Sequence, residues 1–357
     1  MHFEVNRQNF RDTRVSDHPP RPLEPGQVRL AIERFAVTTN NITYAVAGDM
    51  LDYWGFFPVD EQWGRLPVMG LASVTESANE NIAVGGRYFG FYPMADQVVV
   101  NAQGSSAAFR DAGPHRANHA VVYTGFRNVQ DDPEFRPELA NEYLLLWGMF
   151  MTSFLADDQL ADNNFHGAAQ TLVTSASSKT SISLAACLKL RDGHRAVGLT
   201  SERNRTFVES LGLYDQVITY DEVDQLDATV DSGIVDMAGS GPIRASVHNH
   251  FADNLKFSLT VGATHWEDME AEPDLPGPRP EMFFAPGQSA KRAKDWGPDE
   301  LAGRVDRAFA SLLDGTSDWL TVDHRHGADG MAHVYDQLVN GKADPASGFI
   351  VSMGESA

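Results

Sequence analysis

The sequence has 357 residues, enough for two domains, and its 42% hydrophobic content allows a buried core. Its 28 Lys and Arg residues are outnumbered by 49 Asp and Glu residues, and the formal net charge is −21. Such a surface repels phosphate backbones and anionic lipids, so neither nucleic acid nor a membrane is expected as a partner. One cysteine, Cys187, excludes an intramolecular disulfide and any zinc site built from several cysteines.

The N-terminal residues lack the apolar stretch of a signal peptide, and we expect a soluble, cytoplasmic protein. Residues 27–100 carry short strand patterns separated by glycines. Residues 27–35 alternate between apolar and polar with period two, which is typical of a half-buried antiparallel strand. Further strand patterns follow at 72–77, 87–91 and 96–100, and their spacing predicts a small β-barrel.

Strands alternate with helices after a predicted helix at residues 141–160, whose apolar side chains recur at three- and four-residue spacing. The predicted strands lie at 171–174, 196–200, 216–220, 233–237 and 257–262. This alternation predicts right-handed crossovers and a doubly wound parallel sheet, so the fold class is α/β. Five prolines in residues 273–286 predict a long irregular connection. The chain then ends in predicted helices and strands at 300–313, 319–322, 330–340 and 348–351.

A strand, a tight turn and a helix start follow one another in residues 171–185, where backbone N–H groups and the helix dipole can receive a pyrophosphate. A dinucleotide fingerprint has glycines in this turn. Here serines stand at the glycine-like positions: Ser175, Ser178 and Ser181. Serine resists positive φ, so we expect a variant turn. A P-loop is disfavoured because Val173 and Ser178 occupy positions where that motif needs glycine; a plain turn without a ligand stays open.

The end of the next predicted strand indicates which nicotinamide cofactor fits. An NAD-binding chain usually has Asp or Glu there to hold the ribose hydroxyls. This chain has Thr200 and Ser201, followed by Arg203 and Arg205. Guanidinium groups suit a 2′-phosphate, so NADPH is favoured over NADH; the alternative is an ordinary solvated helix start.

Several motifs together resemble a known superfamily. Gly85-Gly-Arg-Tyr-Phe-Gly is similar to the motif G-D-R-V-x-G, and residues 172–181 are similar to V-L-V-T-G-A-S-G-G-V-G with serines for three glycines. The chain resembles the zinc-independent quinone and enoyl reductase branch of the medium-chain dehydrogenase/reductase superfamily, and within it an uncharacterised subgroup with a serine-rich cofactor loop. The resemblance implies a GroES-like β-barrel catalytic domain in residues 1–140 and 286–357, a Rossmann cofactor domain in residues 141–285, and a homodimer.

The expected NADPH-binding residues lie in the serine turn, at the ends of the following strands and in two small-residue loops. They are Ser175, Ser177, Ser178, Lys179, Thr180, Thr200, Ser201, Arg203, Tyr220, Gly239, Gly262, Ala263 and Thr264. The small residues at 239 and 262–264 would let the nicotinamide ring approach the backbone, although ordinary loops have the same composition.

No metal is expected. Zinc-dependent relatives of this superfamily use a Cys and a His in the segments that correspond to residues 37–41 and 68–72, and neither ligand is present here. Cys187 lies in a predicted helix, where a lone thiol is typically part of the core.

Hydride delivery without a metal requires hydrogen-bond donors aimed at the developing oxyanion. In enoyl reductases of the superfamily a tyrosine in the segment after the first barrel strand is the proposed acid, and both Tyr44 and Tyr53 fit here. Asn41 is a further candidate contact to the oxyanion or the ribose. Four aromatic residues would line the substrate pocket: Trp54, Phe57, Phe283 and Phe284. Core packing is the competing explanation for all of these aromatic side chains.

The sequence therefore predicts an NADPH-dependent, zinc-independent reductase that transfers hydride to an activated C=C or C=O of a small apolar substrate. Two alternatives stay open. One is a non-catalytic NADPH-binding sensor or regulatory protein, which the missing glycines favour. The other is an alcohol dehydrogenase that runs in the oxidative direction.

Overall fold

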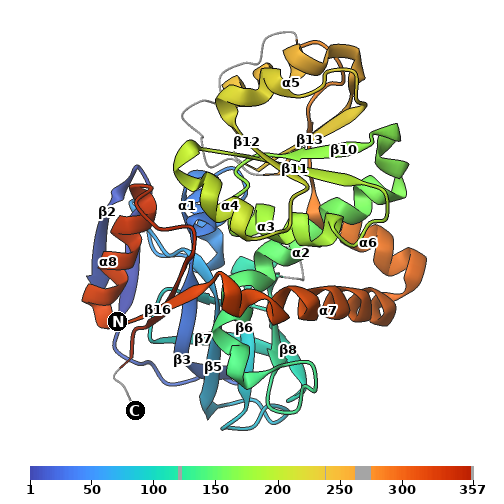
Figure 1. Ribbon diagram of the computed structural model, residues 1–357. Helices are drawn as coiled ribbons and strands as arrows, with labels where there is room; N and C mark the ends of the chain where they lie inside the picture. Colours follow the sequence, from blue (N-terminus) through green and yellow to red (C-terminus); the bar gives the residue numbers. More distant parts are fainter. Residues whose placement is uncertain (120–122, 238, 262–274, 355–357) are drawn as a thin grey trace. The chain divides into compact units, whose positions relative to one another are not determined.

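The computed structural model describes residues 1–119, 123–237, 239–261 and 275–354. The chain forms two compact units (Figure 1). Unit 1 consists of Met1–Leu145 and Leu320–Ala357, and unit 2 of Leu146–Trp319. No helix in the described ranges is both long enough and apolar enough to cross a bilayer.

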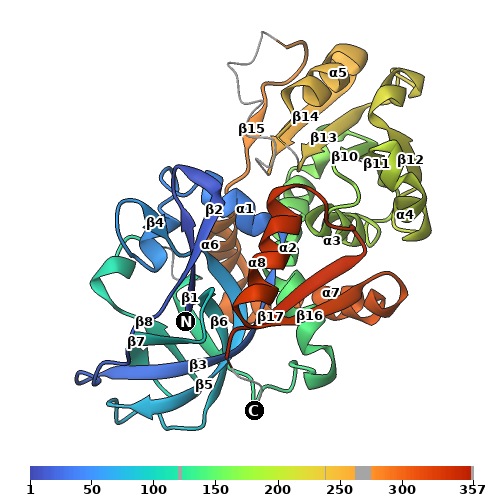
Figure 2. The same cartoon turned by 90° about the vertical axis from the view of Figure 1, so that its left-hand side faces the viewer.

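Unit 1 contains a closed barrel of antiparallel strands (Figure 2). In spatial order the strands are β3 (Gln27–Val37), β5 (Pro67–Ser77), β6 (Arg87–Pro93), β9 (Gly125–Asn128), β8 (Ala108–Asp111) and β7 (Gln97–Gly104). The barrel closes because β3 pairs with both β5 and β7. The period-two pattern of residues 27–35 places Val28, Leu30 and Ile32 in the core, which confirms the predicted barrel.

The remaining elements of unit 1 extend and cover this barrel. β17 (Ser347–Ser352) pairs with β3, β16 (Thr321–His326) runs parallel to β17, and α8 (Gly327–Val339) connects the two. Met331, Val334 and Leu338 lie on one face of α8 and pack into the barrel core. A second, small sheet has the strand order β2-β1-β4, with the bounds β1 (His2–Asn6), β2 (Asn9–Ser16) and β4 (Trp63–Gly64). One helix, α1 (Thr39–Val46), follows β3.

Unit 2 contains a six-stranded parallel sheet. In spatial order its strands are β12 (Gln216–Thr219), β11 (Arg195–Thr200), β10 (Gln170–Val173), β13 (Ser232–Asp236), β14 (Leu255–Thr260) and β15 (Glu281–Met282). The chain adds strands from β10 to β12 on one side of the centre and then from β13 to β15 on the other side. This is the doubly wound Rossmann order and confirms the prediction.

Helices cover both faces of this sheet. Neighbouring residues of a strand point to opposite faces, and here both kinds of position carry apolar side chains that pack against helices. Val173 and Val235 belong to a cluster with Leu184 of α3 (Lys179–Leu188). Leu172 and Ile234 belong to a second cluster with Val247 of α5 (Gly241–Phe251). Figure 1 shows α3 and α5 on opposite sides of the strands; two further helices of this chain are α2 (Ala140–Asp162) and α4 (Arg205–Ser210).

The end of the proline-rich connection corrects one prediction. Pro286 was expected to break regular structure, but it lies in the first turn of a helix, α6 (Ala285–Trp296). Proline is favoured there because its missing N–H has no partner to lose at a helix start. Pro298 begins α7 (Pro298–Asp314) in the same way.

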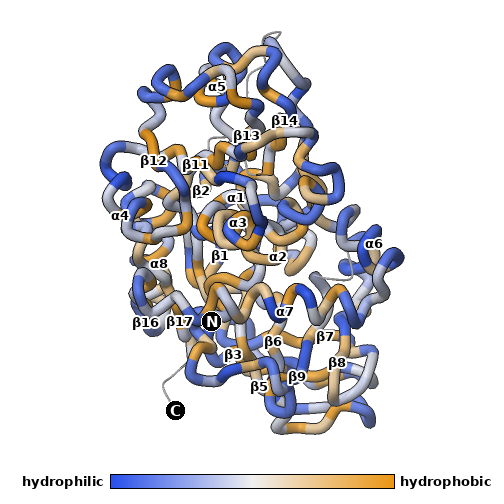
Figure 3. The backbone as a smooth tube through the Cα atoms, turned by 45° about the vertical axis from the view of Figure 1, so that its right-hand side comes forward, coloured by the Kyte–Doolittle hydropathy of each residue, from blue (hydrophilic) through white to orange (hydrophobic). Residues whose placement is uncertain are grey.

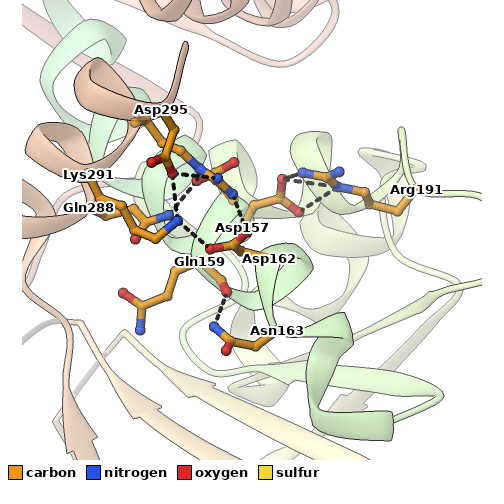
Figure 4. A network of polar contacts seen from close by, with 10 residues as sticks. Asp157, Gln159, Asp162, Asn163, Arg191, Gln288, Lys291 and Asp295 are labelled. Atoms are coloured by element: carbon orange, nitrogen blue, oxygen red, sulfur yellow. Dashed lines mark hydrogen bonds and ion pairs between the residues drawn. The ribbon is translucent and has the colours of Figure 1, made fainter. Parts of the chain in front are cut away.

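A polar network attaches α6 to α2 (Figure 4). Arg292 donates from Nε to Asp158 at 2.6 Å and pairs with Asp162 at 2.9 Å, and Gln288 also donates to Asp158. Asp157 accepts hydrogen bonds from Arg191, which lies three residues after the end of α3. These contacts are polar because α6 is hydrophilic along most of its length (Figure 3).

Aromatic packing attaches α7 to α2 as well. The ring of Phe309 lies 5.1 Å from that of Trp147 and 4.9 Å from that of Phe150. Residues 286–319, which the sequence analysis assigns to the catalytic domain, therefore lie in the unit that contains the parallel sheet.

Candidate functional site

The serine turn of unit 2 connects β10 to α3. Ser175 has a φ of 48°, the left-handed conformation that glycine adopts most easily, so the variant turn is formed by a non-glycine residue. Ser178 is the N-cap of α3, and its Oγ accepts from the N–H of Ser181 at 3.2 Å. Ser181 in turn donates from Oγ to the carbonyl of Thr174 at 2.8 Å. The hydroxyls of Ser178 and Ser181 thus stabilise the turn itself.

The N-terminus of α3 keeps donors that can receive an anion. Within the described residues the N–H groups of Ser177 and Thr180 have no hydrogen-bond partner, and the first turn of α3 has no acidic residue. These free N–H groups and the helix dipole attract negative charge. Lys179 lies between them at the first position of α3 and adds a cation.

Tyr220 contacts the same turn. It follows β12, and its hydroxyl accepts a hydrogen bond from the N–H of Ser175 at 3.2 Å. Burial raises the pKa of Tyr220, so the hydroxyl keeps its proton and can donate it to a further acceptor.

The segment after β11 also lies beside the turn, because Asn204 donates to the Ser177 hydroxyl at 2.9 Å. Arg203 is exposed and has no ion pair within the described residues, whereas Arg205 pairs closely with Glu222. Thr200 is buried at the end of β11 and Ser201 is half-buried. Arg203 is therefore the arginine of this segment whose guanidinium group could bind an anionic ligand.

Asp236, which the sequence analysis did not single out, anchors the turn from the neighbouring strand. This buried carboxylate accepts from the Thr174 hydroxyl at 2.8 Å, from the Gly239 N–H at 3.1 Å and from Arg244 at 2.6 Å. It joins the carboxyl ends of β10 and β13, where ligands bind in open α/β sheets. Gly239 has a φ of 70°. The predicted contacts Gly262, Ala263 and Thr264 lie outside the described residues.

The candidate catalytic residues lie in an aromatic cluster of unit 1. Tyr44 of α1 and Tyr53 stack with ring centroids 4.2 Å apart and planes at 22°. Phe56 and Phe91 continue the cluster, with centroids 5.3 Å apart. Tyr123 packs against the same rings.

Both candidate tyrosines are in the protonated form. Burial raises the pKa of Tyr44 well above its usual value, and the neighbouring Tyr53 and Tyr123 raise it further, while Asn40 lowers it slightly by a hydrogen bond. Burial raises the pKa of Tyr53 as well. Both side chains are half-buried, and the Tyr53 hydroxyl has no hydrogen-bond partner within the described residues. They are chemically competent as proton donors.

Asn41 has a structural role in this geometry. Its Oδ1 accepts from the Thr38 N–H at 2.7 Å and its Nδ2 donates to the Pro67 carbonyl at 2.9 Å. The first bond is part of the capping box of α1, and the two bonds together use both groups of the amide. Asn41 therefore positions the helix that carries Tyr44.

The four predicted pocket residues have different surroundings. Trp54 lies in the barrel core between Gly48 and Gly64, where an added Cβ would come within 2.1 and 2.2 Å of the indole. Phe57 is buried beside Tyr53 in the aromatic cluster. Phe283 packs in a core cluster of unit 2, and Phe284 is 69% exposed. Their substrate contacts stay a prediction.

Two further polar residues contact this aromatic cluster. His119 stacks on Phe56 at 3.9 Å and lies 3.2 Å from the Asp52 carboxylate. Arg116 is buried between Phe56 and Phe57, with its guanidinium carbon 4.7 and 4.5 Å from their centroids. No sequence signal links these positions, because both come from irregular segments. Among the described residues no group of three His, Cys, Asp or Glu side chains could hold a metal ion.

Comparison with protein families decides the chain's membership. Residues 35–344 match the model of a family described as "Protein of unknown function (DUF2855)". The chain belongs to this family. No curated protein matches it.

Several solved structures are similar over nearly the whole chain. The crystal structure of CurA from Vibrio vulnificus in complex with NADPH is 16% identical, with a TM-score of 0.64 and 99% of each chain covered. YhdH from E. coli K-12 with bound NADPH is 14% identical, with a TM-score of 0.60 and 99% of this chain and 100% of that chain covered. A putative NADPH:quinone reductase from Mesorhizobium loti is 13% identical, with a TM-score of 0.59 and 92% of this chain and 88% of that chain covered. These similarities confirm the fold that the sequence resemblance implies, a β-barrel unit and a Rossmann unit.

Proposed function

We propose that the protein is an NADPH-dependent, zinc-independent reductase that transfers hydride to an activated C=C or C=O of a small apolar substrate. The observation that carries this proposal is the turn before α3, with its free N–H groups at the central strand of a Rossmann sheet. The NADPH bound to the structurally similar CurA and YhdH supports the choice of cofactor.

The residues of the turn fit the two ends of this cofactor. The N–H groups of Ser177 and Thr180, with Lys179, would hold the pyrophosphate, and the left-handed Ser175 gives the turn the shape that glycine usually provides. Arg203 would pair with the 2′-phosphate, with the Thr200, Ser201 and Tyr220 hydroxyls nearby in the same strand-end region. Gly239 would face the nicotinamide. When bound, NADPH would supply the hydride.

The tyrosine cluster would supply the proton. Hydride addition to a conjugated alkene or a carbonyl leaves an electron pair on an oxygen, and a neutral tyrosine can stabilise and protonate that oxygen. Tyr53 has a hydroxyl without a hydrogen-bond partner within the described residues, and Asn40 lies close enough to Tyr44 to lower the pKa of that tyrosine. The apolar rings around both suit an uncharged substrate. A homodimer is expected from the family resemblance.

The alternative, a non-catalytic NADPH sensor, would bind the cofactor at the same turn. The N–H of Ser175, which lies in the turn where a pyrophosphate would bind, already donates to Tyr220. Cofactor binding would have to displace this bond or leave one donor unused. A sensor needs affinity for NADPH but no proton donor.

Steady-state oxidation of NADPH against a panel of enones, quinones and aldehydes tests the proposal. We expect turnover with at least one class, and Tyr44→Phe or Tyr53→Phe should lower kcat/KM by about 10²–10⁴-fold for the proton donor. Tyr335→Phe is the matched control, since Tyr335 is buried in the unit 1 core on α8 and should change kcat/KM less than about threefold. NADPH binding without turnover on any compound would support the sensor.

A further inference from the structure

Unit 1 has a cavity of about 690 Å³ whose described lining shares only Phe57 with the predicted catalytic and substrate-binding residues. Its volume lies in the usual range for small-molecule sites. It is lined by the segment between β2 and β3, the start of β7 and residues 57–59. From this cavity we infer a second binding site, specific for a small organic carboxylate with an apolar ring or chain.

The charge of the lining is opposite to that of the whole chain. Its described residues include three arginines, Arg21, Arg29 and Arg65, against one carboxylate, Glu24. The whole sequence has 28 basic and 49 acidic residues. An arginine without an ion pair in this lining would attract an anion locally while the remaining acidic surface repels it.

Two of these arginines form hydrogen bonds to neighbouring residues of unit 1, and the third has a side chain that can bind a ligand. Arg29 donates to Glu76, to Gln97 and to the backbone carbonyl of Arg21, and thereby fastens the segment before β3. Arg65 donates to the buried Glu4 at 3.0 Å. The Arg21 side chain is exposed and has no partner within the described residues.

Imidazoles add neutral donors beside this charge. Arg65 lies 2.8 Å from Nε2 of His18, and because arginine can only donate, Nε2 accepts and the ring proton is on Nδ1. His2 packs edge-on to His18 at 4.9 Å; burial and the nearby cations lower its pKa to about 3, and its buried Nδ1 has no partner. One free guanidinium with neutral imidazole donors matches a single negative charge, which favours a carboxylate over a phosphate dianion.

Most of the remaining lining is apolar, beside the polar side chains of Gln27, Gln97 and His115. Five prolines contribute to it: Pro19, Pro20, Pro22, Pro58 and Pro93. The Arg116 guanidinium carbon lies 4.5 Å from the ring centroid of Phe57, and Val59, Val98 and Val99 also line the cavity. Proline loses no side-chain entropy when a ligand binds, so this wall is preorganised for an apolar body.

Calorimetric titration of the full chain with three probes of equal size tests the site: 3-phenylpropanoate, 3-phenylpropanamide and 3-phenylpropylamine. We expect the carboxylate to bind at least about fivefold more tightly than the amide, and the amine to bind most weakly. No NADPH is added, so the result does not depend on the proposed reductase activity.

Variants locate the binding. Arg21→Gln should weaken the carboxylate about three- to fivefold and leave the amide unchanged, and Val99→Trp should abolish both by filling the cavity. Arg110→Gln is the control, since Arg110 is exposed on β8 and does not line the cavity. Thermal melts establish that each variant is folded. Equal affinity for carboxylate and amide, absence of binding, or an Arg21→Gln variant that binds like the parent chain would each overturn the inference.

Discussion

Arg203 and Arg205 stand two residues apart, but their surroundings differ. Arg205 is neutralised by Glu222, Glu202 and Glu209, whereas Arg203 has no ion pair within the described residues. We therefore expect Arg203→Gln to raise the KM for NADPH about tenfold and to leave the KM for NADH unchanged. Arg205→Gln should lower the melting temperature without changing the preference between the cofactors. Equal effects of Arg203→Gln on both cofactors would contradict a 2′-phosphate contact.

His194 makes unit 2 sensitive to acid. Its ring stacks on Phe165 at 3.8 Å and bonds the Thr171 hydroxyl at 2.7 Å. Burial, with a contribution from Arg191, lowers its pKa from 6.5 to about 4. Between these values the unfolded chain binds a proton that the folded chain does not, so the free energy of unfolding decreases as pH falls from 6.5 to 4.

Melting temperatures at pH 7 and pH 5 check this effect. The decrease between the two pH values should be smaller in His194→Gln than in the parent chain. His333→Gln, which changes an exposed histidine of α8, should keep the full decrease. The prediction fails if His194→Gln and His333→Gln lose stability equally on acidification.

The turn before α3 is the element on which cofactor binding depends, and it contains a strained residue. Ser175 adopts the left-handed conformation at a cost of order 1 kcal/mol. We expect Ser175→Gly to have a free energy of unfolding about 1 kcal/mol higher than that of Ser175→Ala, because both lose the hydroxyl but only glycine relieves the backbone. Urea unfolding of the two variants measures this difference. An alanine variant as stable as the glycine variant would show that the turn is not strained.

Elements with a regular apolar period could be predicted from the sequence. The strands β10 to β14 are short apolar runs between helical segments, and the first half of the barrel strand β3 has apolar residues at every second position. Helix α6 could not be predicted in this way, since it is hydrophilic and is held by side chains of α2 far away in the sequence. Pro286 made α6 harder still to predict, because proline interrupts helices but is also favoured in their first turn.

The candidate site was less predictable than the fold. A turn with small polar residues could be located, but the sequence does not tell which serines cap α3 and which face a ligand. Ser178 caps the helix because its Oγ reaches Ser181, and Asp236 anchors the turn across a distance of 62 residues along the chain. Such contacts depend on strand order, which local patterns do not contain.

At the scale of the whole molecule, α6 stays with unit 2 through a buried charge pair. Asp158 is 6% exposed and Arg292 8% exposed. Arg292→Gln would leave a buried carboxylate without its cation and should lower the free energy of unfolding by about 3 kcal/mol. Arg325→Gln, which removes an exposed partner of Asp323, should cost less than about 1 kcal/mol. Urea unfolding compares the two, and equal losses would contradict the assigned role of the network.

The central claim is that the turn before α3 binds NADPH. Titration calorimetry of the folded chain with NADPH and NADH measures this directly, without a substrate. We expect one NADPH to bind per chain, and we expect NADPH to bind more tightly than NADH. Folded protein that takes up neither nucleotide would contradict it.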